Sequence, residues 1–214
     1  MIVAEGVTLI PLHIGGITLN PTLLWDESMA VLIDTGMPGQ DKQIIEGMKR
    51  VGIPFENLKS VILTHQDIDH IGSLPAKPYI EGGRPLLKME LPEQLQHLLD
   101  NPPKVRVDHT LNYGDELPFF AGVRVIFTPG HTPGHISLYL KRDKILIAGD
   151  AFYCVDGELR APTKKTTLDL SAAQKSITKF LDFDIHKVIC FHGGLCTDGV
   201  NEQLRRLVRH NQVI

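Results

Sequence analysis

The stretch that decides the fold spans residues 60–72, SVILTHQDIDHIG, where a short apolar run leads directly into a dense group of polar residues. Five of its side chains can bind a metal ion or transfer a proton, and these are His65, Gln66, Asp67, Asp69 and His70. Charged residues make up only 22% of the chain, so this concentration of polar chemistry after a strand-like segment calls for a functional explanation.

The same arrangement recurs further along the chain. GHTPGH at 130–135 follows the apolar run RVIFTP, Asp150 follows ILIAG, and His192 follows VICF. Loops at strand ends, held in place by a rigid sheet, are where functional sites are commonly built. Aspartate and histidine would be costly residues with which to finish a buried strand unless they were paired. We therefore expect these residues to gather at one site.

Histidine and carboxylate side chains together, without thiolates, are typical of sites for zinc, iron or manganese. On one tight loop, His65 and Asp67 can face one ion while Asp69 and His70 face its neighbour. Two ions about 3.5–4 Å apart activate a water molecule and polarise an electrophile in hydrolytic enzymes. Such a site requires no serine or cysteine nucleophile.

The length of 214 residues and the hydrophobic content of 43% favour a single domain over residues 1–214. The residue pattern predicts strands at 7–14, 17–25, 29–36, 58–65, 122–131, 136–143, 144–150 and 186–194, of which 58–65 has the apolar run of a buried strand. It predicts helices at 41–52, 91–100, 168–184 and 201–211. Asp169 and Ser171 are both candidates to cap the third of these helices.

Five motifs give the chain a resemblance to the metallo-β-lactamase-fold hydrolases, the superfamily that includes glyoxalase II and the acyl-homoserine lactonases. They are LIDTG at 32–36, THQDIDHIG at 64–72, TPGHTPGH at 128–135, AGD at 148–150 and FHGG at 191–194. They occur in the family's order and approximate spacing. The resemblance implies an α+β fold, a four-layer αββα sandwich of two mixed sheets flanked by helices, with metal ions along one edge.

The resemblance also implies which residues bind those ions. It assigns one ion to His65, Asp67 and His131 and a second ion to Asp69, His70 and His192, with Asp150 bridging the two. The usual family motif is HxHxDH, and in this chain its second histidine is replaced by Asp67. A carboxylate makes the first site harder and more negative, so iron and manganese are alternatives to zinc.

Several other residues have both a structural and a functional interpretation. Asp34 is a turn residue or a support for the metal loop, and His135 is expected to support the site by hydrogen bonds. Tyr153 lines a cleft or donates to a developing oxyanion, as a tyrosine at this position does in acyl-homoserine lactonases. Lys164 and Lys165 contact an anionic substrate or form a solvated pair. No role is assigned to His13, His97, His109, His186 and His210.

The function implied is hydrolysis of an ester, thioester or lactone of a small molecule by a metal-bridging hydroxide, with Asp69 and Tyr153 as catalytic residues. The alternative is an iron-dependent oxidoreductase of the same fold, similar to flavodiiron or persulfide-dioxygenase relatives, which Asp67 makes plausible. A non-catalytic binding module is disfavoured by the complete set of candidate ligands.

Composition excludes other classes of function. The net charge is −3 and the pI near 6.3, so the chain lacks the basic surface of a nucleic-acid-binding protein. Three cysteines offer neither a disulfide framework nor a zinc-finger pattern, and Cys190 in KVICF is expected in the core. The apolar N-terminus lacks a basic segment and is too short to span a membrane. We expect a soluble cytoplasmic enzyme, with its oligomeric state, a dimer included, left open.

Overall fold

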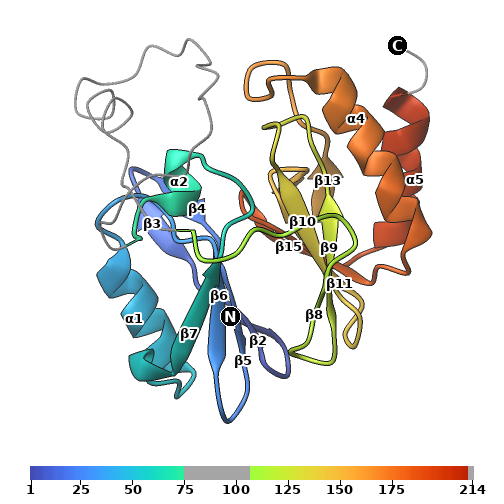
Figure 1. Cartoon of the computed structure of the whole chain (residues 1–214). Helices are drawn as coiled ribbons and strands as arrows, with labels where there is room; N and C mark the ends of the chain where they lie inside the picture. The colour runs from blue at the N-terminus through green and yellow to red at the C-terminus, as the bar shows by residue number, and fades with distance from the viewer. Residues whose placement is uncertain (75–106, 212–214) are drawn as a thin grey trace.

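Two β-sheets pack face to face, and helices cover their outer surfaces (Figure 1). The computed structural model describes residues 1–74 and 107–211. The first sheet has five strands in the order β1-β2-β5-β6-β7: β1 Ile2–Ala4, β2 Val7–Leu9, β5 Thr22–Trp25, β6 Ala30–Ile33 and β7 Leu58–Ile62. The second has six strands in the order β15-β14-β11-β10-β9-β8: β8 Glu116–Leu117, β9 Val123–Phe127, β10 Ile136–Leu140, β11 Ile145–Gly149, β14 Lys187–Cys190 and β15 Gly194–Cys196.

Both sheets are mixed. In the first sheet β6 pairs with β7 in parallel, and in the second β11 pairs with β14 in parallel, whereas the other strand pairs of the two sheets are antiparallel. With α1 (Asp41–Arg50) outside the first sheet and α4 (Leu170–Thr178) and α5 (Val200–Asn211) outside the second, the layers are αββα. The predicted sandwich architecture is confirmed.

The central strands β6 and β11 are apolar at every position because both of their faces are covered. On β11, Ile145 and Ile147 belong to the core between the two sheets, whereas Leu146 packs in the core under α4 and α5. On β6, Val31 lies between the sheets and Leu32 packs beneath α1. Successive side chains of a strand point to opposite faces, so two buried faces produce a continuous apolar run.

The helices follow from their amphipathic patterns and caps. On α1, Ile44 and Met48 are buried one turn apart against the first sheet. On α4, the side chain of Asp169 accepts a hydrogen bond of 2.9 Å from the amide of Ala172, which identifies Asp169 as the N-cap. Shorter helical segments are η1 Phe55–Asn57, α2 Ile68–Ile71 and η2 Lys179–Asp182.

Four strand predictions are corrected. The predicted strands at 7–14 and 17–25 are each interrupted near a proline, giving the separate hairpin β3 (Leu12–Ile14) and β4 (Ile17–Leu19), because proline cannot donate to a sheet. The strand predicted as buried at 58–65 is the edge strand β7, and Lys59, Ser60 and Val61 on it are exposed.

The strand predicted at 186–194 ends at Cys190 in β14, and Gly194 begins the antiparallel strand β15. Strands β1 and β8 were not predicted, and neither was the hairpin formed by β12 (Tyr153–Val155) and β13 (Glu158–Arg160). Its turn is Asp156–Gly157, with φ of 52° and 76°, the left-handed conformation for which Asp-Gly is favoured in two-residue hairpin loops. The helix predicted at 91–100 lies outside the described residues.

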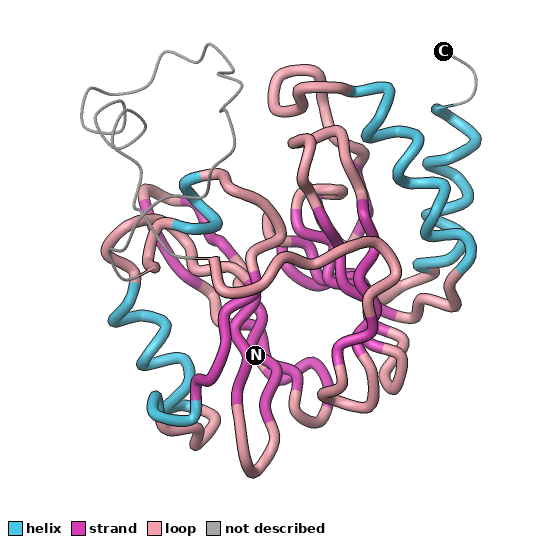
Figure 2. The backbone as a smooth tube through the Cα atoms, in the orientation of Figure 1, coloured by secondary structure: helices cyan, strands magenta, loops and turns pink. Residues whose placement is uncertain are grey.

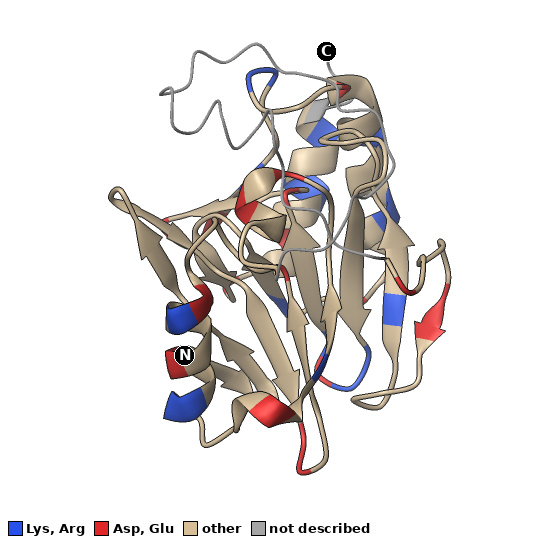
Figure 3. Ribbon diagram, turned by 60° about the vertical axis from the view of Figure 1, so that its left-hand side comes forward, with Lys and Arg blue, Asp and Glu red and all other residues tan. Residues whose placement is uncertain are grey.

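The loops that follow β7, β9, β11 and β14 lie along the upper edge of the sandwich, between the two sheets (Figure 2). Acidic and basic residues are both spread along the ribbon in Figure 3, and the net charge of the chain is −3. Within residues 1–74 and 107–211, no helix has the length and apolar character needed to cross a bilayer.

Candidate metal centre

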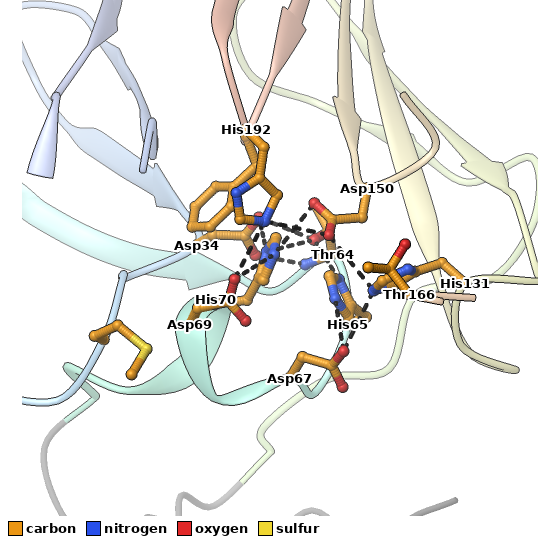
Figure 4. A network of polar contacts seen from close by, with 12 residues as sticks. Asp34, Thr64, His65, Asp67, Asp69, His70, His131, Asp150, Thr166 and His192 are labelled. Carbon is orange, nitrogen blue, oxygen red and sulfur yellow. Dashed lines mark hydrogen bonds and ion pairs between the residues drawn. The ribbon is translucent and has the colours of Figure 1, made fainter. Parts of the chain in front are cut away.

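The loops that follow β7, β9, β11 and β14 bring all seven predicted ligands together at this edge (Figure 4). The first loop divides its polar residues into two pairs. Asp67 has an extended backbone and stands immediately before α2, so His65 and Asp67 precede the helix while Asp69 and His70 lie on it. This change from extended to helical backbone turns the two pairs in different directions.

The first group consists of His65, Asp67 and His131, whose ligand atoms all lie within 4.8 Å of one another. Oδ2 of Asp67 is 3.6 Å from Nε2 of His65 and 3.3 Å from Nε2 of His131. The two histidine side chains are almost completely buried, while the Asp67 side chain is 38% exposed. The group is therefore open to solvent on its carboxylate side.

The second group consists of Asp69, His70 and His192, and its ligand atoms satisfy the same 4.8 Å limit. Oδ2 of Asp69 is 3.8 Å from Nε2 of His70 and 3.2 Å from Nε2 of His192. His70 is fully buried, whereas Asp69 and His192 are partly exposed. Solvent thus reaches this group from the side of Asp69 and His192.

Asp150 lies between the two groups. Its Oδ1 is 3.4 Å from Nε2 of His70, and its Oδ2 is 3.5 Å from Nε2 of His131 and 3.4 Å from Nε2 of His192. The carboxylate is buried and contacts both groups.

The donor atoms fit a metal site better than a network of direct hydrogen bonds. Nε2 of His65, His70 and His131 and Oδ1 of Asp150 are buried without a hydrogen-bond partner in the described part of the chain. Charge-assisted hydrogen bonds are about 2.7–2.9 Å long, whereas ligand atoms about 2.0–2.2 Å from a tetrahedral ion lie roughly 3.3–3.6 Å apart. The contacts between carboxylate oxygens and Nε2 atoms span 3.2–3.8 Å.

The electrostatics of the second group also favour a cation. Burial disfavours a charged His192 ring, but the carboxylates of Asp150 and Asp69 outweigh burial and raise the pKa of His192 to about 9. Burial likewise opposes a charge on His70, yet Asp34, Asp69 and Asp150 hold its pKa well above the usual value. Without an ion the group therefore holds protons, which a metal would displace.

Asp34 supports this site, as one of its two sequence interpretations proposed. Its Oδ2 lies 2.9 Å from Nδ1 of His70 and accepts a hydrogen bond of 2.9 Å from the hydroxyl of Thr64. That hydroxyl is in turn 3.0 Å from Nδ1 of His65. These partners place a hydrogen on Nδ1 of both histidines, inferred from the network, and direct both Nε2 lone pairs into the two groups.

His135 supports the site through the backbone, consistent with the prediction that it is not a ligand. Its Nε2 accepts a hydrogen bond of 2.9 Å from the amide of Asp150, and its Nδ1 lies 2.8 Å from the hydroxyl of Thr128. Burial, with the neighbouring histidines, holds the pKa of His135 well below its usual value. At Gly149, where φ is 57°, a Cβ atom would lie 2.7 Å from Nε2 of His135. Glycine permits this close approach.

His192 is positioned by a contact between the two halves of the chain. The backbone amide and the side-chain amide of Asn20 both donate to the carbonyl of Phe191, each at 3.0 Å. The ring of Phe191 stacks on His70 with centroids 3.7 Å apart. Phe191, which precedes His192, thus contacts both the connection between β4 and β5 and a histidine of the second group.

Tyr153 is partly buried beside the second group, with its ring centroid 5.9 Å from that of His192. Its hydroxyl lies 2.7 Å from that of Thr166. Burial raises the pKa of the phenol, and the hydrogen bond with Thr166 partly opposes that rise. Lys164 and Lys165 are exposed next to Thr166 on the same loop.

Four of the five histidines without an assigned role lie apart from the two groups, as the sequence interpretation assumed. The fifth, His97, is outside the described residues. His13 contacts Thr18, His186 contacts Asp184, and His210 contacts the carbonyl of Arg206. His109 is exposed. None of the described four belongs to a group that could hold an ion.

Sequence reasoning missed residues that contact the candidate ligands or their neighbours: Thr64 contacts His65 and His70, Thr128 contacts His135, and Thr166 contacts Tyr153. It also missed Phe191, which stacks on His70, and Asn20, which donates to the carbonyl of Phe191. Thr64 directly precedes His65, and its position between a strand and the loop that carries the ligands could have marked it as a residue that contacts them. Thr166 and Asn20 act on residues far from them in the chain, and no local pattern marks such contacts.

Comparison with known proteins adds independent findings. The sequence model of the family described as the metallo-beta-lactamase superfamily matches residues 15–192. The probable metallo-hydrolase YflN of Bacillus subtilis is 32% identical over 201 residues, covering 76% of this chain and 75% of the relative. The hydroxyacylglutathione hydrolase GloC of Haemophilus influenzae is 32% identical over 146 residues, covering 63% of this chain and 66% of the relative.

Among solved structures, a metallo-beta-lactamase family protein of Thermus thermophilus superposes with a TM-score of 0.72 at 22% identity. The match covers 99% of this chain and 81% of that protein. At this identity the likeness concerns the fold, and it extends over both sheets and their flanking helices.

Proposed function

Because the chain belongs to the metallo-beta-lactamase superfamily, we propose that it is a metal-dependent hydrolase that cleaves an ester, thioester or lactone of a small molecule. The observation that carries this proposal is the pair of histidine–carboxylate groups joined by Asp150. The names of the relatives are consistent with it, since YflN is described as a probable metallo-hydrolase and GloC as a hydrolase of hydroxyacylglutathione.

In this proposal each group would hold one divalent ion, and Asp150 would be a ligand available to both. Zinc is the first choice, with iron or manganese as alternatives because Asp67 adds a hard oxygen ligand to the first group. When bound, the ions supply Lewis acidity, which makes water more acidic and polarises a carbonyl group. The buried, unpartnered Nε2 atoms support this assignment because they otherwise carry an uncompensated cost of burial.

We propose that Asp69 handles the proton of the attacking water. Burial alone would raise the pKa of its carboxyl group, but His70 and His192 lower it, so the group is ionised at neutral pH. Its side chain is 26% exposed, whereas that of Asp150 is 5% exposed. Of the two carboxylates that lie near both His70 and His192, Asp69 is therefore the one that water and a leaving group can reach.

Tyr153 is proposed to stabilise the negative charge that develops on the substrate oxygen. Its ring stands beside His192 of the second group, and a phenol donor in a partly buried site can stabilise an oxyanion. No side chain of serine, threonine or cysteine is needed as a nucleophile in this scheme.

The test is elemental analysis of the purified protein combined with hydrolysis assays on a panel of thioesters, lactones and aryl esters. We expect activity with at least one substrate class and loss of that activity when a chelator removes the metal. Activity should recover when one kind of metal ion is added back. Unchanged hydrolysis after complete removal of metal would contradict the proposal.

A second candidate, an iron-dependent oxidoreductase, is favoured by one specific observation. Asp67 places a carboxylate between His65 and His131, which makes the first group suited to iron. Protein that contains iron when grown without metal supplements, and that consumes oxygen without hydrolysing the panel, would support this candidate over the hydrolase.

A further inference from the structure

The hydroxyl groups of Tyr153 and Thr166 lie 2.7 Å apart, the ideal length for a hydrogen bond between two hydroxyls. Tyr153 belongs to β12, whereas Thr166 belongs to the loop that leads to α4. The contact is therefore tertiary, and it joins two segments that both border the metal centre.

The loop holds Thr166 in place by backbone hydrogen bonds. The amide of Thr166 donates to the carbonyl of Thr163 at 3.1 Å, closing a turn. Two residues later, the amide of Leu168 donates to the carbonyl of His131 at 3.3 Å. Thr166 is thus fixed between its own turn and a ligand of the first group, and it can serve as a rigid partner for the phenol.

The alternatives open to the Thr166 hydroxyl are weaker. The hydroxyl and the carbonyl of Thr163 lie 3.3 Å and 3.4 Å from it, longer than well-formed hydroxyl hydrogen bonds. When Thr166 donates its hydrogen to the phenol oxygen, the phenol hydrogen remains available to another acceptor. An aliphatic side chain at position 166 could neither hold the phenol nor donate to it.

We propose that Thr166 is a positioning residue for Tyr153. It holds the phenol beside His192 and donates to the phenol oxygen, so that the phenol hydrogen is directed to the substrate oxygen. The inference rests on the proposed hydrolase function and adds to it a residue that acts only through Tyr153.

The kinetic test compares Thr166→Val, Thr166→Ser and Thr163→Val in metal-loaded protein. Thr166→Val is expected to lower kcat about three- to tenfold with KM within about twofold, the effect of losing one neutral hydrogen bond. Thr166→Ser retains the hydroxyl and should restore kcat to within about twofold of the parent. Thr163→Val removes a hydroxyl from the same turn without touching Tyr153, and it should leave kcat unchanged.

A double-mutant cycle separates positioning from a general structural effect. In a Tyr153→Phe background, Thr166→Val should have no further effect on kcat, because the group through which it acts is gone. An equal loss in both backgrounds would show that Thr166 acts on the loop rather than on the phenol, and would overturn the inference. A Thr166→Val variant with parental kcat would overturn it as well.

NMR of protein labelled at tyrosine Cζ tests the hydrogen bond between Tyr153 and Thr166 by a measurement that does not depend on an activity assay. At constant pH, Thr166→Val should shift the Tyr153 resonance, assigned by its loss in Tyr153→Phe, while Thr166→Ser should not. An unmoved resonance would contradict the contact. If Tyr153→Phe retains full hydrolysis, this inference fails while the hydrolase proposal stands; if the loaded parent hydrolyses nothing in the panel, both fail.

Discussion

Nδ1 of His70 lies 2.9 Å from Oδ2 of Asp34, and the hydroxyl of Thr64 contacts that same oxygen at 2.9 Å. The Thr64 hydroxyl also contacts Nδ1 of His65 at 3.0 Å. A single buried carboxylate thereby contacts one histidine of each histidine–carboxylate group, directly in the second group and through a threonine in the first.

Removing the charge of Asp34 should therefore weaken both metal groups. Asp34 has a φ of 62°, a conformation that asparagine tolerates, so Asp34→Asn changes the charge with little backbone strain. We expect metal affinity, measured by competition with a chromophoric chelator, to fall about 10–100-fold. The control is Asp26→Asn, which alters an exposed carboxylate that accepts hydrogen bonds from Ser28. Equal affinities in the two variants would contradict the role of Asp34.

Two ions per chain are expected in fully loaded protein. His192→Ala removes a ligand of the second group only, so metal content should fall toward one ion per chain and kcat by orders of magnitude. The matched control is His186→Ala, which removes a 55% exposed histidine paired with Asp184. Mass-spectrometric metal analysis with parallel assays provides the measurement. Full activity in protein shown to hold one ion would defeat the two-ion scheme.

Asp67 is expected to set the choice of metal. Asp67→His restores the family's usual HxHxDH motif and replaces a hard oxygen with an imidazole nitrogen, so the zinc share should rise relative to iron and manganese. Both proteins are grown in identical medium and their metal contents compared. Identical metal ratios would show that the carboxylate does not determine selectivity.

Metal binding should release protons at neutral pH. The pKa of His192 is raised to about 9 because Asp150 and Asp69 outweigh the effect of burial, so without metal the ring is charged at pH 7.5. A metal requires the neutral ring, and His70, whose pKa is also raised, adds to the release. Calorimetry in two buffers of different ionisation enthalpy should therefore show about one to two protons released at pH 7.5 and fewer at pH 10. A proton count that does not change with pH would contradict this assignment.

The cysteines should be dispensable for turnover. Burial is the main cause that raises the pKa of Cys196 to about 11 and raises that of Cys154, so neither thiol is a nucleophilic thiolate at neutral pH. The double variant Cys154→Ser/Cys196→Ser should keep most of its kcat. Mass spectrometry of the parent protein during turnover should find no acylated peptide. An acyl-cysteine or acyl-serine adduct would contradict a mechanism in which water attacks the substrate without a covalent intermediate.

Local patterns predicted that the candidate ligands follow the ends of apolar strands, whereas the four-layer architecture and the division of the ligands into two groups were implied by the family resemblance. Asp150 and His192 could be recognised from the apolar runs that precede them, and those runs arise because both faces of β11 and β14 are covered. The exposure of β7 was not predicted, since SVIL resembles a central strand and only the sheet order shows that it lies at an edge. The pairing of Tyr153 with Thr166 depends on how a loop folds back, which no periodicity encodes.

Each metal group takes residues from both halves of the chain, with His65 and Asp67 meeting His131, and Asp69 and His70 meeting His192. An ion held by either group would be a cross-link between the two layers, and its binding free energy would add to the resistance of the layers to separation. Such coupling is reciprocal. Substitutions in the core between the sheets, at Leu24 or Leu138, should therefore weaken metal retention even though these side chains are no part of either group.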